Sequence, residues 1–206
     1  MSEAEELWDW RRKVADLYHD VRAGADAEAA WRHWGATRAA MFRSHPQSPI
    51  EPDGRPAFDG PALFPYDPAL RQKVRVTAAP PQRLALGTGA DGTTAMHAFA
   101  RTDGLRRLLG GELTLYWIEG YGGGVFLPFA DDTNGAETYG GGRYLLDTIK
   151  GADLGAVAAD GTLLLDFNFS YFPSCAYSSR YVCPLAPPEN RLPAAVRGGE
   201  RLRETP

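Results

Sequence analysis

The sequence predicts a mainly β fold with N-terminal helices (α+β), in which an antiparallel meander forms a sandwich or a partly open barrel. Three observations lead to this prediction. From residue 72 onward, apolar side chains alternate with polar ones in short runs, which is the period of β-strands. Aspartate-glycine and glycine-glycine pairs separate several runs, and such short turns join antiparallel strands because parallel strands need long crossovers. Residues 1–44 have helical periodicity instead.

The composition is that of an ordinary globular protein. Its 206 residues are 44% hydrophobic and 23% charged, which suffices for one sizeable core, and we expect a single domain over residues 1–206. Within it we expect a helical part at 1–44, an extended proline-rich connector at 45–71, and a β body at 72–200 with a long loop at 170–191.

Charge and hydropathy exclude two classes of partner. The formal net charge of -4 argues against a general nucleic-acid-binding protein, which usually carries a basic face. No apolar run approaches the roughly 20 residues of a transmembrane helix, so no membrane partner is expected. The acidic N-terminus lacks the basic start and apolar core of a secretory signal, and we expect a cytoplasmic location.

Two amphipathic helices are expected before the body. Apolar residues recur at helical spacing over residues 3–22, and Gly24 ends this helix. Asp26 caps a second helix, which ends before Pro46 because proline disfavours the helical conformation in the residue before it. The apolar faces are rich in tryptophan, so we expect them to pack on the sheet or on a partner.

The β body follows a connector whose aromatic residues should anchor it. Strands are expected at residues 73–79, 83–88, 93–101, 105–109, 112–119, 125–129, 143–149, 162–169 and 192–197. Turns are expected at Asp91-Gly92, Asp103-Gly104 and Asp160-Gly161, because these dipeptides suit the tight turns between strands.

The segment from Asp166 to Pro193 combines features that a solvated loop does not need. It is too irregular for a helix and too rich in proline for a central strand, yet it carries many aromatic residues and both cysteines. We expect it to pack onto the sheet and to line a pocket. Asp166 and Asn168 are expected to share one face of the strand that enters it, with the two neighbouring phenylalanines on the other face.

Five phrases of the sequence carry a resemblance to a known family. They are FLPFADDTNGAETYGGGRYL at 126–145, LDFNFSYFPSCAYS at 165–178, CPLAPPENRLPAAVRGGE at 183–200, and the shorter HPQSP at 45–49 and FPYDPALR at 64–71. These phrases resemble an uncharacterised bacterial and archaeal family, the domain of unknown function 1684. The resemblance implies no known activity, cofactor or substrate. The family is expected to carry asparagine where Phe172 stands and serine where Asn134 stands, so a ligand contact through that asparagine would be absent here.

The glycine run Gly140–Gly142 leads directly to Arg143. Successive glycine N–H groups can form an anion-binding nest, and a guanidinium beside it would suit a carboxylate or phosphate group of a ligand. The run is equally typical of bulges and tight turns, because glycine readily adopts positive φ. Arg143 has a structural alternative as well, an ion pair with Asp166 or Glu189 that ties the long loop down.

The two cysteines, Cys175 and Cys183, have three interpretations. As thiolates they make only half of a tetrahedral zinc site, and no neighbouring CxxC pair completes it, so no metal is expected. Small buried thiols are the ordinary interpretation in a cytoplasmic protein. A nucleophilic Cys175 would need a base such as His45 or His97 within hydrogen-bond reach.

These features predict a cytoplasmic small-molecule binding protein, or an enzyme of unassigned reaction, with a pocket between loops 131–143 and 166–190. Arg143 would hold an anionic group, and Asp166 or Glu189 would handle a proton. The other expected ligand contacts come from Tyr139, Asn168, Tyr177, Asn190 and His45. No cofactor is expected.

Two other functions stay open at the level of the sequence. A non-enzymatic interaction protein would use its N-terminal helices to bind a partner or a second copy as a homodimer, through Trp8, Trp10, Trp31 and Trp34. A cysteine-dependent hydrolase or transferase would use Cys175 as its nucleophile.

Overall fold

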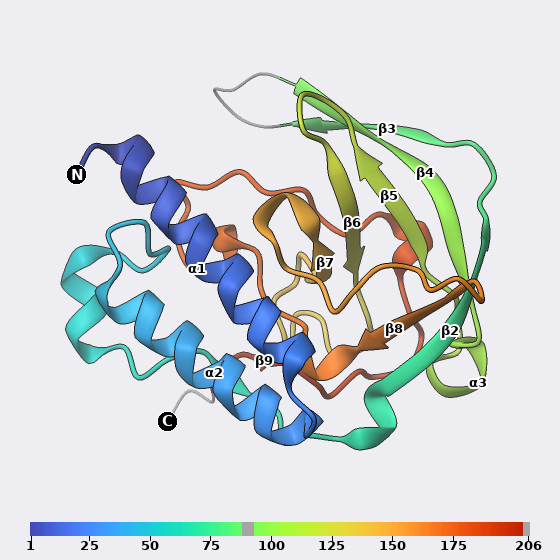
Figure 1. Ribbon diagram of the computed structural model, residues 1–206, viewed down its shortest axis with the longest axis horizontal. Coiled ribbons are helices and arrows are strands. Elements are labelled where there is room, and N and C mark those ends of the chain that lie inside the picture. Colours follow the sequence, from blue (N-terminus) through green and yellow to red (C-terminus); the bar gives the residue numbers. More distant parts are fainter. Residues whose placement is uncertain (88–92, 204–206) are drawn as a thin grey trace.

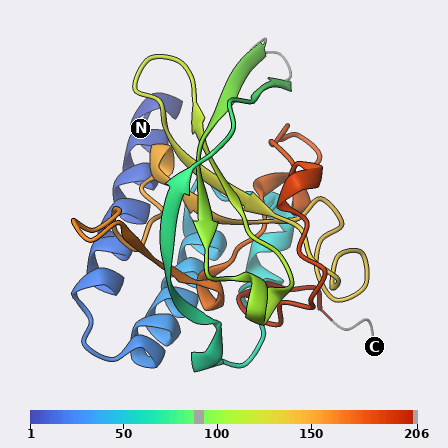
Figure 2. The ribbon, with the colours of Figure 1, turned by 90° about the vertical axis from the view of Figure 1, so that its right-hand side faces the viewer.

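An antiparallel sheet curled into a half-barrel forms the body of the computed structural model, and two helices pack against it (Figures 1 and 2). The structure describes residues 1–87 and 93–203. The strands of the sheet are β2 (Arg71–Ala78), β3 (Arg83–Gly87), β4 (Thr93–Asp103), β5 (Thr114–Ile118), β6 (Gly124–Phe129), β7 (Arg143–Asp147) and β8 (Thr162–Asp166). A small second sheet pairs β1 (Ala62–Leu63) with β9 (Glu200–Arg201). The predicted α+β fold with a partly open antiparallel barrel is confirmed.

The two N-terminal helices begin and end where the sequence predicts. α1 (Glu3–Ala23) starts with a capping box, in which the Ser2 side chain accepts from the N–H of Glu5 and the Glu5 carboxylate accepts from the N–H of Ser2. Asp26 caps α2 (Ala27–Ser44) by accepting from two N–H groups of its first turn. Short polar side chains thus satisfy N–H groups that the start of a helix leaves unpaired.

The large sheet is a meander with the strand order β7-β6-β5-β4-β2-β8. The first half of β4 pairs with β3 and its second half pairs with β2, so these two strands share one side of β4 while β5 occupies the other. The register between β4 and β5 shifts at Phe99, which forms a β-bulge. A bulge bends and twists its strand, which helps the sheet to curl.

Contacts made after β8 draw the two edges of the sheet together. β7 and β8 stand at opposite ends of the strand order. The chain that leaves β8 reaches β7, where the N–H of Tyr144 donates to the carbonyl of Tyr171 at 2.9 Å and the N–H of Tyr171 donates back at 3.1 Å. This backbone bridge partly closes the barrel.

Alternation along the strands supplies two apolar clusters. Neighbouring residues belong to different clusters, as Leu115 and Tyr116 do in β5. One cluster joins the strands to the C-terminal segment through Val196 and to the short helix α3 (Arg106–Leu109). The other cluster contains Trp34 together with residues of α1, so the helices cover this face of the sheet.

Most tryptophans of the helices are buried or partly buried within the chain itself. Trp34 is fully buried, and Trp10 and Trp31 are partly buried, whereas Trp8 is 72% exposed. The apolar faces of the helices therefore complete the core. In the part of the chain that the structure describes, no helix has the length and apolarity that crossing a membrane requires.

The prediction of a strand at residues 105–109 is wrong, because they form α3 instead. The Glu112 carboxylate accepts from three successive N–H groups at the start of this helix. Gly110, with φ 77, ends it in the left-handed conformation that glycine adopts without strain. The Asp103-Gly104 pair and the Gly110-Gly111 pair thus lie on either side of a helical turn, where the sequence predicted a strand.

Two other predicted strands differ in the structure. The strand predicted at 162–169 ends at Asp166, whose side chain accepts from the N–H of Asn168 and so begins a 3₁₀ turn. The two side chains therefore do not share a strand face. Residues 192–197 are not a strand either, and the last strand of the described chain is β9. The predicted turn at Asp91-Gly92 lies outside the described residues.

Short 3₁₀ turns punctuate the connector and the long loop. They are η1 (Pro52–Ala57), η2 (Pro68–Leu70), η4 (Thr148–Lys150), η5 (Phe167–Phe169), η6 (Ser174–Ala176) and η7 (Pro188–Asn190). Several begin with proline, whose fixed φ suits the first position of a helical turn.

Trp34→Ala is expected to destabilise the protein by about 3–5 kcal/mol, because it removes a large, fully buried side chain and leaves a cavity beneath α2. Trp8→Ala, on the exposed side of α1, is expected to change stability by less than about 0.5 kcal/mol. Urea unfolding followed by circular dichroism measures both. Equal losses in the two variants would contradict the assignment of the helices to the core.

Candidate functional site

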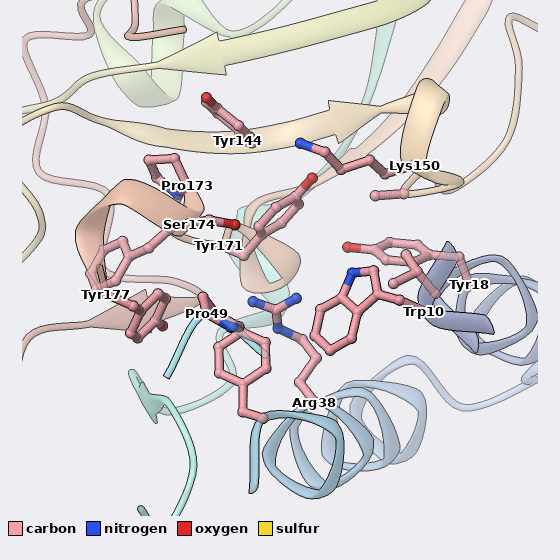
Figure 3. Close-up of a pocket in the computed structure, with 14 residues that line it drawn as sticks. Trp10, Tyr18, Arg38, Pro49, Tyr144, Lys150, Tyr171, Pro173, Ser174 and Tyr177 are labelled. Atoms are coloured by element: carbon pink, nitrogen blue, oxygen red, sulfur yellow. The ribbon is translucent and has the colours of Figure 1, made fainter. Parts of the chain in front are cut away.

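A small pocket with a cavity volume of about 50 Å³ lies between α1, α2, β7 with the turn that follows it, and residues 171–177 (Figure 3). We call it the Arg38 pocket. Its lining residues are Trp10, Val14, Tyr18, Arg38, Phe42, Pro49, Tyr144, Lys150, Ala152, Tyr171, Phe172, Pro173, Ser174 and Tyr177. These residues are widely separated in the sequence, so only the folded chain forms the pocket.

Arg38 provides a nearly buried cation on the wall formed by α2. Its Nε and Nη2 both donate to a single oxygen of Glu200, Oε1, at 2.9 and 2.5 Å. The rings of Trp34, Phe42 and Tyr171 lie between 4.9 and 5.0 Å from the guanidinium carbon. A guanidinium tolerates this environment because it is weakly hydrated and is attracted to the faces of aromatic rings.

Glu200 compensates the charge of Arg38 and is itself fully buried. Its second oxygen, Oε2, accepts from the N–H of Phe172 at 2.6 Å and from the hydroxyl of Tyr177 at 2.8 Å. The Glu200 carboxylate, on β9, is thus bound by donors from α2 and from the long loop, and these hydrogen bonds fix the loop against the helix.

Lys150 provides a second cation, in the turn that follows β7. Its ammonium lies 2.9 Å from Asp147 Oδ2 and 5.9 Å from the centre of the Tyr144 ring. Figure 3 shows the Arg38 guanidinium and the Lys150 ammonium directed toward the space around Tyr171 from different sides. Both cations therefore face the pocket while each keeps one carboxylate partner.

The hydroxyl groups of Tyr18 and Tyr171 stay protonated at neutral pH. Burial raises the pKa of Tyr18 to about 12, and burial also raises the pKa of Tyr171 well above its ordinary value. The Tyr18 oxygen accepts from Trp34 Nε1 at 3.3 Å, so its own proton is free to point elsewhere. Both side chains line the pocket as neutral hydrogen-bond donors.

Donors outnumber acceptors in the Arg38 pocket. The carboxylate of Glu200 is already engaged by three protein side chains or backbone groups, and that of Asp147 by Lys150. Within the described residues, no hydrogen bond uses Arg38 Nη1 or the hydroxyl protons of Tyr18, Tyr171 and Ser174, and none of these groups is a fully buried atom without a partner. An anionic group would supply acceptors to several of them at once.

Arg143, predicted to hold an anion, is fully buried and does not line this pocket. Its Nη2 donates to Asp131 Oδ2 and to the carbonyl of Val196, each at 2.7 Å, and its Nη1 donates to the carbonyl of Gly198 at 2.5 Å. Burial lowers its pKa, against the attraction of Asp131. The geometry is that of the structural tie, although the partner is neither of the carboxylates named from the sequence.

Glu189 and Asn190 connect the long loop to the sheet. The buried Asn190 amide accepts from the N–H of Thr114 at 2.8 Å and donates to the carbonyls of Thr114 and Pro128 at 2.9 and 2.7 Å. Glu189 Oε1 accepts from the hydroxyl of Tyr116 at 2.7 Å. Neither side chain lines the Arg38 pocket.

Asp166, Asn168 and His45 also lie outside the Arg38 pocket. Asn168 exchanges two hydrogen bonds with the backbone of Asp67, at 2.8 and 2.9 Å, and thereby fixes the end of the connector. His45 Nε2 lies 2.9 Å from Asp9 Oδ2, which joins the end of α2 to α1. Asn168 and His45 thus have structural partners within the chain.

The Arg38 pocket lies between the long loop and the helices, and no residue of loop 131–143 lines it. Of the side chains predicted to bind ligand, Tyr177 lines it and Tyr139 does not. Phe172, which stands where the family is expected to carry asparagine, is part of its wall. Of the two segments predicted to form a pocket, the long loop thus contributes to the Arg38 pocket and loop 131–143 does not.

The sequence did not predict Arg38 or Lys150 as site residues, although the pattern around Arg38 is unusual. Arg38 interrupts the apolar stripe of α2, since Trp34 and Met41 lie one turn on either side of it and both are buried. An arginine within such a stripe indicates a buried charge with a partner elsewhere. Lys150, beside a short apolar strand, left no comparable signal.

The two cysteines lie near Tyr139 and are free thiols. The Tyr139 hydroxyl is 3.7 Å from Cys175 Sγ, and the N–H of Cys175 donates to Cys183 Sγ at 3.4 Å. Burial raises the pKa of Cys183 to about 11. Among the described residues, no histidine contacts either thiol, and no group of three or more His, Cys, Asp or Glu side chains could hold a metal ion.

Comparisons with known proteins give a family and a fold. A family model described as "Protein of unknown function (DUF1684)" matches residues 56–201. The solution NMR structure of an uncharacterised protein from Haloarcula marismortui is similar, with 34% sequence identity and a TM-score of 0.59. That similarity covers 86% of this chain and 96% of the other. No curated protein matches the chain.

Arg143→Ala is expected to destabilise the protein by about 3–5 kcal/mol, because it leaves the buried Asp131 carboxylate without its partner. Arg197→Ala removes an exposed ion pair with Glu137 and is expected to cost less than about 1 kcal/mol. Chemical denaturation of both variants measures the difference. A stable Arg143→Ala protein would show that the interior does not depend on this pair.

Cys183 is expected to react with iodoacetamide at pH 8 more than about tenfold more slowly in the native protein than in urea, because its raised pKa leaves little thiolate. Mass spectrometry of the labelled peptides gives the rate. The native rate should rise as the pH approaches 11. Equal rates in native and unfolded protein would contradict the burial of this thiol.

Proposed function

The chain belongs to the DUF1684 family of proteins of unknown function, and we propose that it binds a small anionic molecule in the Arg38 pocket. We place this activity in the cytoplasm, because both cysteines are free thiols and a reducing compartment preserves thiols. The ligand class is a carboxylate or a phosphate monoester attached to a planar apolar group.

The observation that carries the proposal is the excess of donors over acceptors. Arg38 uses two of its nitrogens on one oxygen of Glu200, so its Nη1 remains for a ligand. The buried hydroxyls of Tyr18 and Tyr171 add neutral donors beside it. These groups line the pocket, so an anionic ligand placed there would gain charge-assisted hydrogen bonds from them.

The walls of the pocket favour a planar group on the ligand. Aromatic rings of Trp10, Tyr144 and Phe172 surround the donors, and prolines of the connector and the long loop complete the lining. Aromatic walls with a few fixed polar groups are typical of sites for small organic molecules. The ligand would place its anionic end between the two cations and its flat part against these rings.

Binding is better supported than catalysis. No histidine, cysteine or carboxylate is among the lining residues of the Arg38 pocket, and its tyrosines keep their protons at neutral pH. Ser174 and Lys150 line the pocket, but no histidine or carboxylate that could activate the serine is among the described lining residues. The cysteine-dependent reaction finds no base beside Cys175, whose near neighbour is the hydroxyl of Tyr139.

An interaction protein remains the second candidate, and one observation favours it. Trp8 exposes 72% of its surface on α1, and Leu7 beside it exposes 38%. The remaining tryptophans of both helices are buried or partly buried against the body. The exposed area is thus small compared with a stable protein interface.

Lys150→Gln and Tyr171→Phe are expected to weaken anion binding by about tenfold or more each, since each removes one charged or buried donor. Benzoate and phenyl phosphate serve as anionic probes, with benzamide and benzyl alcohol as uncharged probes of similar shape. Titrations followed by NMR report the indole resonance of Trp10 and the dissociation constants. Only the anions should produce saturating shifts.

Lys73→Gln is the matched control for Lys150→Gln, because Lys73 also pairs with one aspartate but lies outside the pocket. It should bind the anions as the wild type does. Arg38 itself is not substituted, because its loss would leave Glu200 buried and unpaired. The proposal fails if neither anion shifts the Trp10 resonance at millimolar concentration, or if Lys150→Gln binds both anions as tightly as the wild type.

A further inference from the structure

A second pocket, with a cavity volume of about 70 Å³, lies at the C-terminal end of α1, and Asp166 is one of its lining residues. Asp166 is fully buried, and its Oδ2 has no hydrogen-bond partner within the described residues. A buried carboxylate oxygen without a hydrogen bond is expensive to maintain in a fold. The two pockets share no lining residue, so this site is independent of the Arg38 pocket.

The position of this free oxygen is fixed by the other half of the carboxylate. Asp166 Oδ1 accepts from the N–H of Asn168 at 3.0 Å and from its Nδ2 at 2.8 Å. These bonds form the turn that ends β8, and they leave Oδ2 without a hydrogen-bond partner at a residue that lines the pocket. The oxygen is therefore a preorganised acceptor, and it is not needed to complete the turn.

Arg71 places a positive charge beside this acceptor. It is the residue opposite Asp166 in the pairing of β2 with β8, and its Nε lies 3.5 Å from Oδ2, in an ion pair without a hydrogen bond. The side chain is 44% exposed, so its guanidinium is free to bind an anionic group from solvent. A second arginine of the lining, Arg22, donates two hydrogen bonds to Asp153, one to its carbonyl and one to Oδ1.

The remainder of the pocket is mostly apolar. Its walls are formed by aliphatic and aromatic side chains of α1, α2, β8, the loop before β8 and the turn after it, namely Val21, Ala27, Ala30, Leu154, Leu164 and Phe169. A simple cation would gain the Asp166 carboxylate but would be repelled by Arg71. A simple anion would gain Arg71 but would be repelled by Asp166. Only a ligand with both charges satisfies both groups.

We propose that this pocket binds a free α-amino acid with a small or medium apolar side chain. The ammonium group donates to Asp166 Oδ2, the carboxylate binds the guanidinium of Arg71, and the side chain packs against Leu164 and Phe169. The separation of the two charges in an amino acid is short, as is the separation of Asp166 and Arg71. Burial raises the pKa of Asp166, and an ammonium ligand would oppose this rise.

Isothermal titration calorimetry with the wild-type protein tests the proposal, with alanine, valine, leucine and phenylalanine as probes. The tightest of these is then compared with its decarboxylated amine and with the carboxylic acid that lacks its amino group. The amino acid is expected to bind at least about tenfold more tightly than either analogue, because each analogue leaves one charge of the pocket unpaired. An amine that binds as well as its amino acid would overturn the assignment of Arg71.

Asp166→Asn is expected to weaken amino-acid binding at least about tenfold, because the amide at the position of Oδ2 cannot accept from an ammonium. The variant keeps an oxygen for the two donors of Asn168, so the turn is retained, and circular dichroism checks the fold. Arg71→Gln, at a half-exposed position, tests the second contact without disturbing the interior.

Asp160→Asn serves as the control, because Asp160 is an exposed carboxylate near the start of β8 and pairs with Lys73 outside the pocket. It should bind the amino acid as the wild type does. The inference is overturned if none of the four amino acids binds at millimolar concentration, or if Asp166→Asn and Arg71→Gln both bind as the wild type does.

Discussion

The buried ion pair between Arg38 and Glu200 holds the helices, the long loop and the C-terminal strand in one arrangement. The carboxylate accepts from α2 through one oxygen and from Phe172 and Tyr177 through the other. Neither charge could stay in the interior alone, because the desolvation of an isolated ion is not repaid. The positions of the three segments are therefore coupled, and the Arg38 pocket exists because of this coupling.

A second buried ion pair, between Arg143 and Asp131, fixes the opposite side of the C-terminal segment in place. Arg143 also donates to carbonyls of residues 196 and 198, so the segment that brings Glu200 to Arg38 is itself held by a guanidinium. Its path leaves no room for a side chain at Gly199, where φ is +75 and a Cβ would lie 2.1 Å from the carbonyl oxygen of Ser170. The polar interior is thus a connected framework, and the pockets lie at its margins.

This arrangement explains why the predicted site and the observed pocket differ. The sequence drew attention to polar residues within aromatic segments, and most of them, such as Arg143 and Asn190, serve as ties between loops and sheet. Structural hydrogen bonds and ligand contacts use the same residue types in the same loops, because both need donors and acceptors in fixed positions. The helix that forms one wall of the pocket was predicted, but its role in the pocket depends on a partner located elsewhere.

The sequence by itself determined the helices, through capping residues such as Asp26, and most strands, through alternation over a few positions. These signals are local, because hydrogen bonds and side-chain faces in helices and strands follow from near neighbours. Only the tertiary structure decided which charges are paired, as with Arg38 and Glu200, which are 162 positions apart. The free energy of such a pair depends on burial and on the approach of distant segments, and neither is encoded in the spacing of nearby residues.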